Sequence, residues 1–437
     1  MNVNKKILGY SFALLAAFML AGLAGWYFFL NQQTQTISTI DTARGLGTND
    51  SSFQSAVGNT YDNIVSGITS LVTGTSTPTQ GDSAPPQLWQ ITRTPVAGMA
   101  FAGTGSSTKL YFAESSTGYI LTANPETGVL DRLTNKLFPK TQGVVFAREA
   151  VVLRSIDENG DIASFVGNIS SSTSADGTHV FSSKSLESNI SEIVSAPYTH
   201  GFLYLTQTPL GGSEGVLLSA DGTKRKVVFS SPIGGWKPIS LADGRTFFVL
   251  RPADNIPGFA YELKKDGSLA LMAGNAPGLT FLPNASSTAL IYGTSERGSL
   301  SLFARTREDA TAVSIPIKTV ADKCVWSTET PTAAQSTTTP KISSKSAPIV
   351  KPLIAYCAVP QFVTSNTFLN DWYKGAIHTS DSWWRVDVSS GTVELLLSPS
   401  ATNQSIDVKN PIMDASGKYI SFMNTTDNTL WLLRISK

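Results

Sequence analysis

Short apolar runs alternate with polar turns from Leu88 to the C-terminus. Lys109 to Ala113, Tyr119 to Thr122 and Val129 to Leu133 are three such runs, rich in Leu, Val and Tyr, and turns that contain Thr-Gly separate them. Runs of this length that end at glycine turns are typical of β-hairpins. This part of the chain has no convincing helix of ten residues, so the pattern predicts an all-β domain.

The same unit of strand, turn and strand recurs along this domain. Its further copies are Val151 to Leu153 with Ile162 to Phe165, Val216 to Leu218 with Val227 to Phe229, Phe247 to Leu250 with Phe259 to Leu263, Ala289 to Tyr292 with Ser299 to Phe303, Trp384 to Asp387 with Val393 to Leu397, and Tyr419 to Phe422 with Leu430 to Leu433. Their period of about 47 residues is near that of four-stranded propeller blades. We therefore expect a β-propeller over residues 88–437 with seven blades, six or eight being the alternatives, in which a strand at Leu88 to Thr92 completes the last blade.

One repeat carries a resemblance to a known family. Met413 to Phe422, followed by Leu430-Trp431, resembles the repeat of WD40-like propellers of the TolB type, in which a turn of the form Asp-x-x-Gly precedes an apolar strand. With its Trp372-Tyr373-Lys374-Gly375 segment, the chain is also similar to membrane-anchored propellers of bacteria. The resemblance implies the fold and no activity, because this repeat occurs both in periplasmic scaffolds and in the propellers of peptidases.

An uncharged apolar run from Ile7 to Leu30 follows Lys5 and Lys6. As a helix it would be about 36 Å long, enough to cross a hydrocarbon core of about 30 Å. Because the lysines precede the run, the positive-inside rule places the N-terminus in the cytoplasm and the rest of the chain outside. We expect residues 7–30 to anchor the protein in the lipid bilayer of the cytoplasmic membrane as a single-pass helix, within a first segment 1–30. A signal peptide cleaved at Gly25 is the alternative.

Residues 31–87 have the Ser, Thr, Gly and Pro composition of an extended stalk. Within them, residues 53–72 carry apolar side chains at helical spacing, which predicts a marginal helix. Val57 to Leu71 fits two heptads, so the alternative is a seam for homo-oligomerisation.

Charge narrows the choice of partners. Charged residues make up only 15% of the chain and its net charge is +1. This balance provides no basic stripe to neutralise phosphates, so we do not expect a nucleic-acid partner. The Ser, Thr, Gly and Asn that replace charged residues suit a domain outside the cytosol.

Cys324 and Cys357 are the only cysteines, and each lies in an apolar run. Between them, residues 328–350 are rich in Thr, Ser and Pro, which predicts a disordered insertion. In an extracytoplasmic domain we expect a disulfide at the base of this insertion, closing a loop of about 32 residues. Two buried free thiols are the alternative.

No catalytic, cofactor-binding or metal-ligating residue follows from the motifs. The histidines, His179, His200 and His378, are too few and too scattered for a histidine metal cluster, and no serine has a Gly-x-Ser-x-Gly elbow. Asp157 to Asp161 begins like a calcium loop, but Ile162 stands where such a loop requires glycine, so a hairpin turn is expected. We expect no cofactor.

An aromatic cluster precedes the last two blades. Trp372, Tyr373, Trp383, Trp384 and Arg385 are of the residue types that dominate interaction hot spots. They are a candidate patch for binding a protein or a glycan, and the alternative is that the rings fill the gap between neighbouring blades.

Two functions from different classes remain. The first and favoured one is a binding or scaffolding propeller that docks an envelope protein or a polysaccharide. The second is a propeller hydrolase that acts on glycans or peptides through carboxylates at the mouth of its funnel. Convergence of two carboxyl groups would distinguish them, because glycosidases need such a pair.

Overall fold

The computed structural model describes residues 86–148, 150–173, 177–328, 352–401 and 404–435. The predicted membrane anchor at 7–30, the stalk with its helix at 53–72, and almost all of the insertion at 328–350 lie outside these ranges. Within them, no helix has both the length and the apolar composition needed to span a bilayer.

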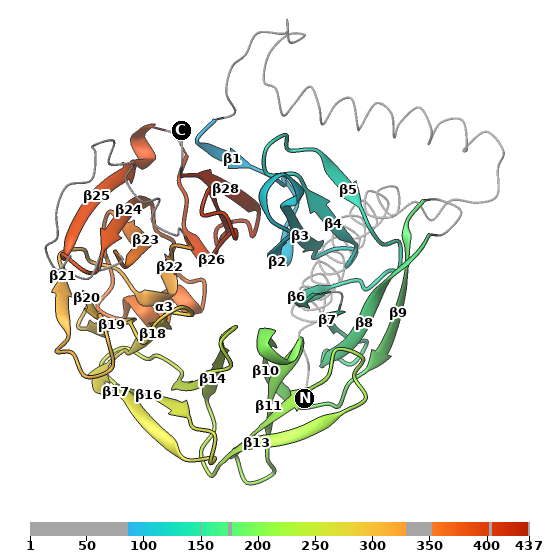
Figure 1. Cartoon of the computed structure of the whole chain (residues 1–437), viewed down its shortest axis with the longest axis horizontal. Coiled ribbons are helices and arrows are strands. Elements are labelled where there is room, and N and C mark those ends of the chain that lie inside the picture. Colours follow the sequence, from blue (N-terminus) through green and yellow to red (C-terminus); the bar gives the residue numbers. More distant parts are fainter. Residues whose placement is uncertain (1–85, 149, 174–176, 329–351, 402–403, 436–437) are drawn as a thin grey trace, which may run out of the picture. The chain divides into compact units, whose positions relative to one another are not determined.

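The described strands form seven four-stranded sheets, which are arranged in a ring (Figure 1). This is a seven-bladed β-propeller, as the spacing of the repeats predicted. All strand pairs within the sheets are antiparallel, and consecutive strands are neighbours in each blade.

The strands of each blade are given in chain order. Blade 1 contains β2 (Val96–Ala102), β3 (Lys109–Glu114), β4 (Ile120–Ala123) and β5 (Leu130–Arg132); blade 2 contains β6 (Thr141–Ala147), β7 (Ala150–Ile156), β8 (Ile162–Thr173) and β9 (His179–Ser185); blade 3 contains β10 (Ile190–Ala196), β11 (Gly201–Gln207), β12 (Ser213–Leu218) and β13 (Arg225–Ser231); blade 4 contains β14 (Trp236–Ser240), β15 (Thr246–Leu250), β16 (Pro257–Leu263) and β17 (Leu269–Pro277). Blade 5 contains β18 (Thr280–Pro283), β19 (Leu290–Glu296), β20 (Ser299–Arg305) and β21 (Val313–Ile315); blade 6 contains β22 (Cys324–Trp326), β23 (Ile354–Pro360), β24 (Asp381–Asp387) and β25 (Thr392–Leu397); blade 7 contains β26 (Val408–Met413), β27 (Tyr419–Asn424), β28 (Leu430–Arg434) and β1 (Leu88–Gln90).

Five short helical segments lie between the strands: η1 (Gly105–Ser107), η2 (Pro197–Thr199), η3 (Ala321–Lys323), α3 (Phe368–Tyr373) and η4 (Pro399–Ala401). The first strand of each blade lies nearest the centre of the ring, and these inner strands surround its channel (Figure 1). We call the end of the channel where the inner strands begin the upper end, and the end where they finish the lower end.

β1 closes the ring, as predicted. It pairs with β28 through Leu88 and Leu433, Trp89 and Leu432, and Gln90 and Trp431, so the last blade takes one strand from each end of the domain. Trp89 also reaches blade 1, where its indole lies against Gly128; a Cβ at Gly128 would meet the ring at 2.1 Å. This turn therefore needs glycine for space as well as for its positive φ of 73°.

The hydrophobic core is divided among the interfaces between the blades. Seven clusters of buried side chains correspond to the seven interfaces between neighbouring blades, and an eighth lies beneath α3. Both faces of a middle strand are buried: Val151 and Leu153 of β7 face blade 1, whereas Val152 faces blade 3. Such strands appear in the sequence as continuous apolar runs because neither face meets water.

The hairpin turn predicted between β7 and β8 is also confirmed. One carboxylate oxygen of Asp157 accepts hydrogen bonds from the backbone N–H groups of Asn159 and Asp161, both at 2.9 Å. Gly160 supplies the positive φ that the turn requires. The Asp157 side chain is thus used in shaping the turn.

Candidate functional site

A cavity of about 660 Å³ occupies the lower end of the channel. It lies between the inner strands of blades 7, 1, 2 and 3, along their final residues. Its walls are lined by Met99, Ala100, Phe101, Val144, Val145, Phe146, Ala147, Arg148, Ile193, Val194, Ser195, Pro197, His200, Ile412 and Met413. We call this cavity the channel pocket. Its volume falls in the range of small-ligand and peptide sites.

The lining of the channel pocket is mostly apolar, with Arg148 and His200 at one side, and no carboxylate is among the lining residues just listed. Both residues are exposed and sit in tight turns with positive φ, 54° and 55°, that follow β6 and β10. Neither side chain makes a hydrogen bond or ion pair with another described residue.

At the upper end, α3 is held over the inner edge of the ring by three carboxylates from different places in the fold (Figure 1). Asp254 accepts a hydrogen bond from the Asn370 N–H at 2.7 Å, and the indole N–H of Trp372 donates to Asp407 at 2.9 Å. The Tyr373 hydroxyl donates to Asp322, which also forms a 3.1 Å ion pair with Lys237 of blade 4. The helix thus joins blades 4, 6 and 7.

Beneath α3 lies a buried ionic network that the sequence did not predict. The ammonium group of Lys323 has no solvent exposure and lies 2.6 Å from both Asp381 and Asp407, which are themselves fully buried. It also donates to the Thr379 hydroxyl at 2.9 Å and lies 4.7 Å from the centre of the Trp372 ring. The network joins blade 6 to blade 7 at the upper end of the ring.

Burial and neighbouring charges shift the pKa values of the titratable groups at the upper end in different directions. Burial raises the pKa of Asp381, although Lys323 opposes this. Burial has the same tendency at Asp407, but Lys323 and the hydroxyl donors outweigh it and lower the pKa of that carboxyl. Tyr373 is 44% exposed as a residue, yet desolvation at its hydroxyl and the charge of Asp322 raise its pKa well above the usual value.

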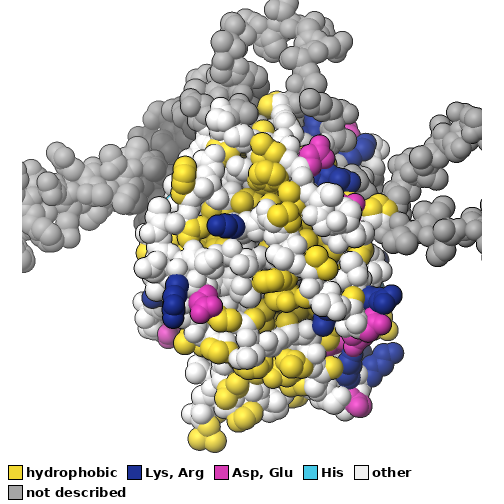
Figure 2. Space-filling model, turned by 90° about the vertical axis from the view of Figure 1, so that its left-hand side faces the viewer, with side chains coloured by type: hydrophobic (Ala, Val, Ile, Leu, Met, Phe, Trp, Pro, Cys, Tyr) yellow, Lys and Arg dark blue, Asp and Glu magenta, His cyan; other side chains and the backbone are white. Residues whose placement is uncertain are grey.

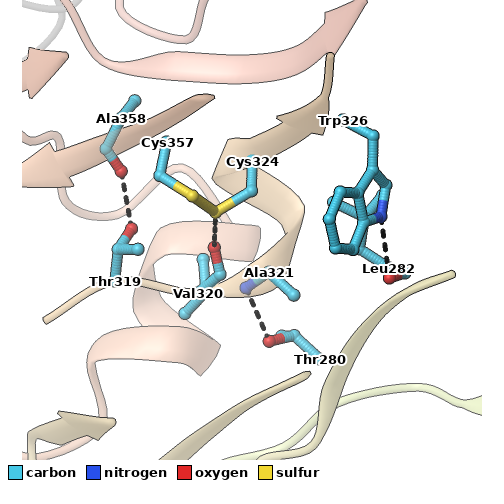
Figure 3. The surroundings of a disulfide bond; sticks show 9 residues. All are labelled: Thr280, Leu282, Thr319, Val320, Ala321, Cys324, Trp326, Cys357 and Ala358. Carbon is cyan, nitrogen blue, oxygen red and sulfur yellow. Dashed lines mark hydrogen bonds between the residues drawn. A yellow bond between two sulfur atoms is a disulfide. The ribbon is translucent and has the colours of Figure 1, made fainter. Parts of the chain in front are cut away.

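The predicted disulfide is present. Cys324 and Cys357 are directly opposite each other on β22 and β23 and form a bond within blade 6 (Figure 3). Residues around it bind blade 5: the Trp326 indole donates to the Leu282 carbonyl at 3.3 Å, and the Ala321 N–H donates to the Thr280 hydroxyl at 2.9 Å. The disulfide therefore lies inside a blade interface, and its role there is structural.

The five residues of the predicted aromatic patch do not share one surface. Trp372 and Trp383 are buried, with 5% and 2% exposure. Trp383 packs against blade 7, whereas the half-buried Trp384, next to it on β24, packs against the disulfide cluster on the opposite face of the blade. Arg385 is half-buried on the same strand. Tyr373 is the most accessible of the five, so a binding role for the set stays a prediction.

The outer rim of the ring offers a second apolar surface. Figure 2 shows hydrophobic side chains gathered in a band on the rim, where charges are sparse. Exposed members on the outer strands of blades 4, 5 and 6 include Leu271, Val313 and Leu395, which are 58%, 54% and 49% exposed. These are unpaired sheet edges, where isolated apolar side chains are common.

The described residues contain no group of three or more His, Cys, Asp or Glu placed to hold a metal ion. Ser195 and His200 both line the channel pocket, but no hydrogen bond joins their side chains, and no carboxylate of the lining set completes a triad. The chemistry of the pocket therefore consists of apolar contact and positive charge.

Comparisons with known proteins found similar solved structures, but no protein-family model and no curated protein matches the sequence. Similar solved structures include the β-propeller domain of Cps50 (Swd1) from Myceliophteria thermophila, with a TM-score of 0.46, 9% identity, and coverage of 80% of this chain and all of that one. The WD40 domain of Pan2 from Neurospora crassa has a TM-score of 0.45 and 10% identity, covering 79% and 90% of the two chains. TolB from Acinetobacter baumannii has a TM-score of 0.36 and 11% identity, covering 78% and 79%.

These likenesses concern the fold alone. WD40 and TolB propellers are both among these structures. The seven blades of the chain itself establish the architecture.

We predict that Trp383→Ala lowers the free energy of unfolding by about 3–5 kcal/mol, because a large buried ring is lost from the interface with blade 7. Trp383→Phe should cost much less, since the indole N–H has no hydrogen-bond partner among the described residues. Urea denaturation of the two variants tests this. An alanine variant as stable as the wild type would place the ring outside the core.

We predict that Lys323→Met lowers the free energy of unfolding by about 3–5 kcal/mol at pH 7, because two buried carboxylates lose their cation. In wild type, the stability contributed by Asp407 is present above its unfolded pKa of about 3.9 and is lost as the pH falls through its lower folded pKa. In the variant the cation is absent, burial still raises both pKa values, and hydrogen bonds such as those from Thr379, Thr425 and the Val408 N–H oppose it. We expect burial to outweigh these bonds, so that both folded pKa values lie above the unfolded ones and stability returns as the pH falls from 7.

Denaturation of the Lys323→Met protein between pH 5 and pH 7 measures this difference. Lys374→Met is the matched control, because Lys374 is an exposed lysine beside α3. An equal decrease in the free energy of unfolding at every pH in that range would contradict a role for the carboxylates that have lost their cation.

Proposed function

We propose that this protein is a membrane-tethered binding propeller, which holds its ring outside the cytoplasm and docks an envelope protein or polysaccharide in the channel pocket. The observation that carries the proposal is the pocket itself: a mostly apolar cavity with Arg148 and His200 at one side and no carboxylate among its described lining residues. Such a site can hold and orient a ligand through apolar contact and a positive charge, which is what binding requires.

No observation on the described residues favours the hydrolase alternative. Among the described residues, Asp381 and Asp407 converge on Lys323, which lies between them, and neither carboxylate is exposed. A glycosidase needs both carboxyl groups at the scissile bond, on opposite sides of a bound sugar ring. These two groups stabilise the fold and cannot reach a substrate.

Two features support a position outside the cytoplasm. The apolar run of residues 7–30 has the length and flanking charges of an anchor. The disulfide fits an oxidising compartment, because cytosolic thiols are kept reduced. A homo-oligomer through residues 57–71 would bring several pockets together and raise avidity.

We expect the full chain to sediment with membranes, to resist alkaline extraction and to dissolve in detergent, because residues 7–30 stay in the bilayer. Deletion of residues 1–30 should release the protein. An enzyme reporter that is active only outside the cytoplasm, fused after Lys437, should be active on the full chain and inactive on the deletion. A soluble protein whose mass shows cleavage at Gly25 would contradict the tether.

We expect an anilinonaphthalene sulfonate dye, which is apolar and anionic, to bind the channel pocket with increased fluorescence. Ala100→Leu places three additional carbons in the lining and should weaken binding about tenfold, the factor that corresponds to 1.4 kcal/mol. Ala376→Leu, at an exposed position beyond α3, is the control that adds the same carbons elsewhere. Equal dye binding by both folded variants would show that the pocket is not the binding site.

A further inference from the structure

We infer that the channel pocket binds an extended apolar peptide segment of about four residues, flanked by an acidic side chain, which pairs with the backbone of an inner strand. This inference rests on the proposed function, because it names the class of ligand for the same pocket. It follows from three properties of the walls: their backbone edges, the length of their apolar stretches, and the charge at their lower ends.

The backbone edges are the first property. β2, β6, β10 and β26 each pair with one other strand only, which lies on the side away from the channel. Their channel-side N–H and C=O groups therefore have no partner strand among the described elements. A peptide in extended conformation presents donors and acceptors at the same spacing and can add to such an edge. A hydrocarbon chain offers no such groups.

The length of the apolar stretches is the second property. The longest continuous part of the lining is Val144 to Arg148 on and just beyond β6, and Met99 to Phe101, Ile193 to Ser195 and Ile412-Met413 line the other walls. At about 3.3 Å per residue, a stretch of this size is matched by about four residues of extended peptide. Apolar side chains on that peptide would meet the partly buried Met99, Phe101 and Phe146, and few polar groups are available to bind the hydroxyls of a sugar.

The charge is the third property. Arg148 and His200 lie where β6 and β10 end, which is the lower mouth of the pocket. No carboxylate is among the described lining residues, so none of them neutralises the positive charge of Arg148. An arginine guanidinium binds a carboxylate with two hydrogen bonds. An acidic side chain next to the apolar segment would meet this pair, so the ligand is acidic at the mouth and apolar inside.

The experiment uses the full chain in detergent and a fluorescent peptide in which four residues, alternating Val and Leu, adjoin two glutamates. Binding is followed by fluorescence polarisation. We expect saturable binding, about tenfold weaker when glutamine replaces the glutamates. We also expect about tenfold weaker binding when alternate amides of the apolar part are N-methylated, because the donors to the strand edge are then lost.

Matched variants locate the peptide. Arg148→Gln and His200→Asn should each weaken binding of the glutamate peptide and leave that of the glutamine peptide unchanged. Arg297→Gln is the control: Arg297 is also exposed and also has a positive φ, 50°, but it lies in blade 5 away from the pocket. Asparagine at position 200 tolerates the left-handed conformation found there.

The outcomes separate this inference from the proposed function. If the sulfonate dye binds and Ala100→Leu blocks it, but the peptide does not bind, the pocket is a ligand site and the peptide inference is wrong. Competition by laurate together with equal affinity for the N-methylated peptide would indicate an anionic amphiphile instead and would overturn it as well. If neither dye nor peptide binds, the proposed function is wrong, and the peptide inference that rests on it is wrong as well.

Discussion

Closure of the ring is the constraint on which the rest of this structure depends. Each blade packs only against its two neighbours, so the apolar faces are all buried only when the last blade meets the first. The closing strand is short: β1 forms three residue pairs with β28, supported by bonds from Ile91 N–H to Leu430 and from Arg434 N–H to Gln87. Leu88 packs toward blade 6 and Trp89 toward blade 1, so this one strand contributes to both interfaces of blade 7.

The two ends of the channel are built on different physical principles. The upper end is polar and cross-linked, because α3 connects blades 4, 6 and 7 through buried or half-buried carboxylates. Lys323 neutralises the deepest of these and makes three hydrogen bonds there, which offsets the cost of removing the charge from water. The lower end has no such links among its lining residues, and its apolar walls are free to contact a ligand. The stabilising links and the proposed binding pocket thus lie at opposite ends.

The propeller could be predicted from the sequence because its information is local. Every blade repeats a strand and a glycine turn, and runs such as Val151 to Leu153 remain apolar since both faces of the strand are buried. The disulfide was also predictable, because the chain has only two cysteines and each lies in a strand-like run. The order and spacing of the apolar runs carried the first inference, and the number and local context of the cysteines carried the second.

The sites were harder to predict, because their residues are far apart in the sequence. Lys323 is 58 and 84 residues from its two aspartates, and nothing in the local sequence of any of them indicates an ion pair. α3 was missed because six residues are too few to show a helical period, although Phe368, Leu369 and Trp372 form its buried face. The tryptophans of β24 face opposite blades, which a cluster in sequence does not reveal. The channel pocket combines short stretches from four strands and has no motif of its own.

The position of β1 also has a mechanical meaning. Any pull on the chain before residue 87 enters the ring through the short strand that closes it, at the end where Gln87 receives the bond from Arg434. A load applied at that end of an antiparallel pair breaks its hydrogen bonds one after another rather than all at once. A pulling force would therefore open the ring at the β1–β28 pair, where the rest of the chain joins it. Blade 7 would unfold before the disulfide-bonded blade 6 beside it.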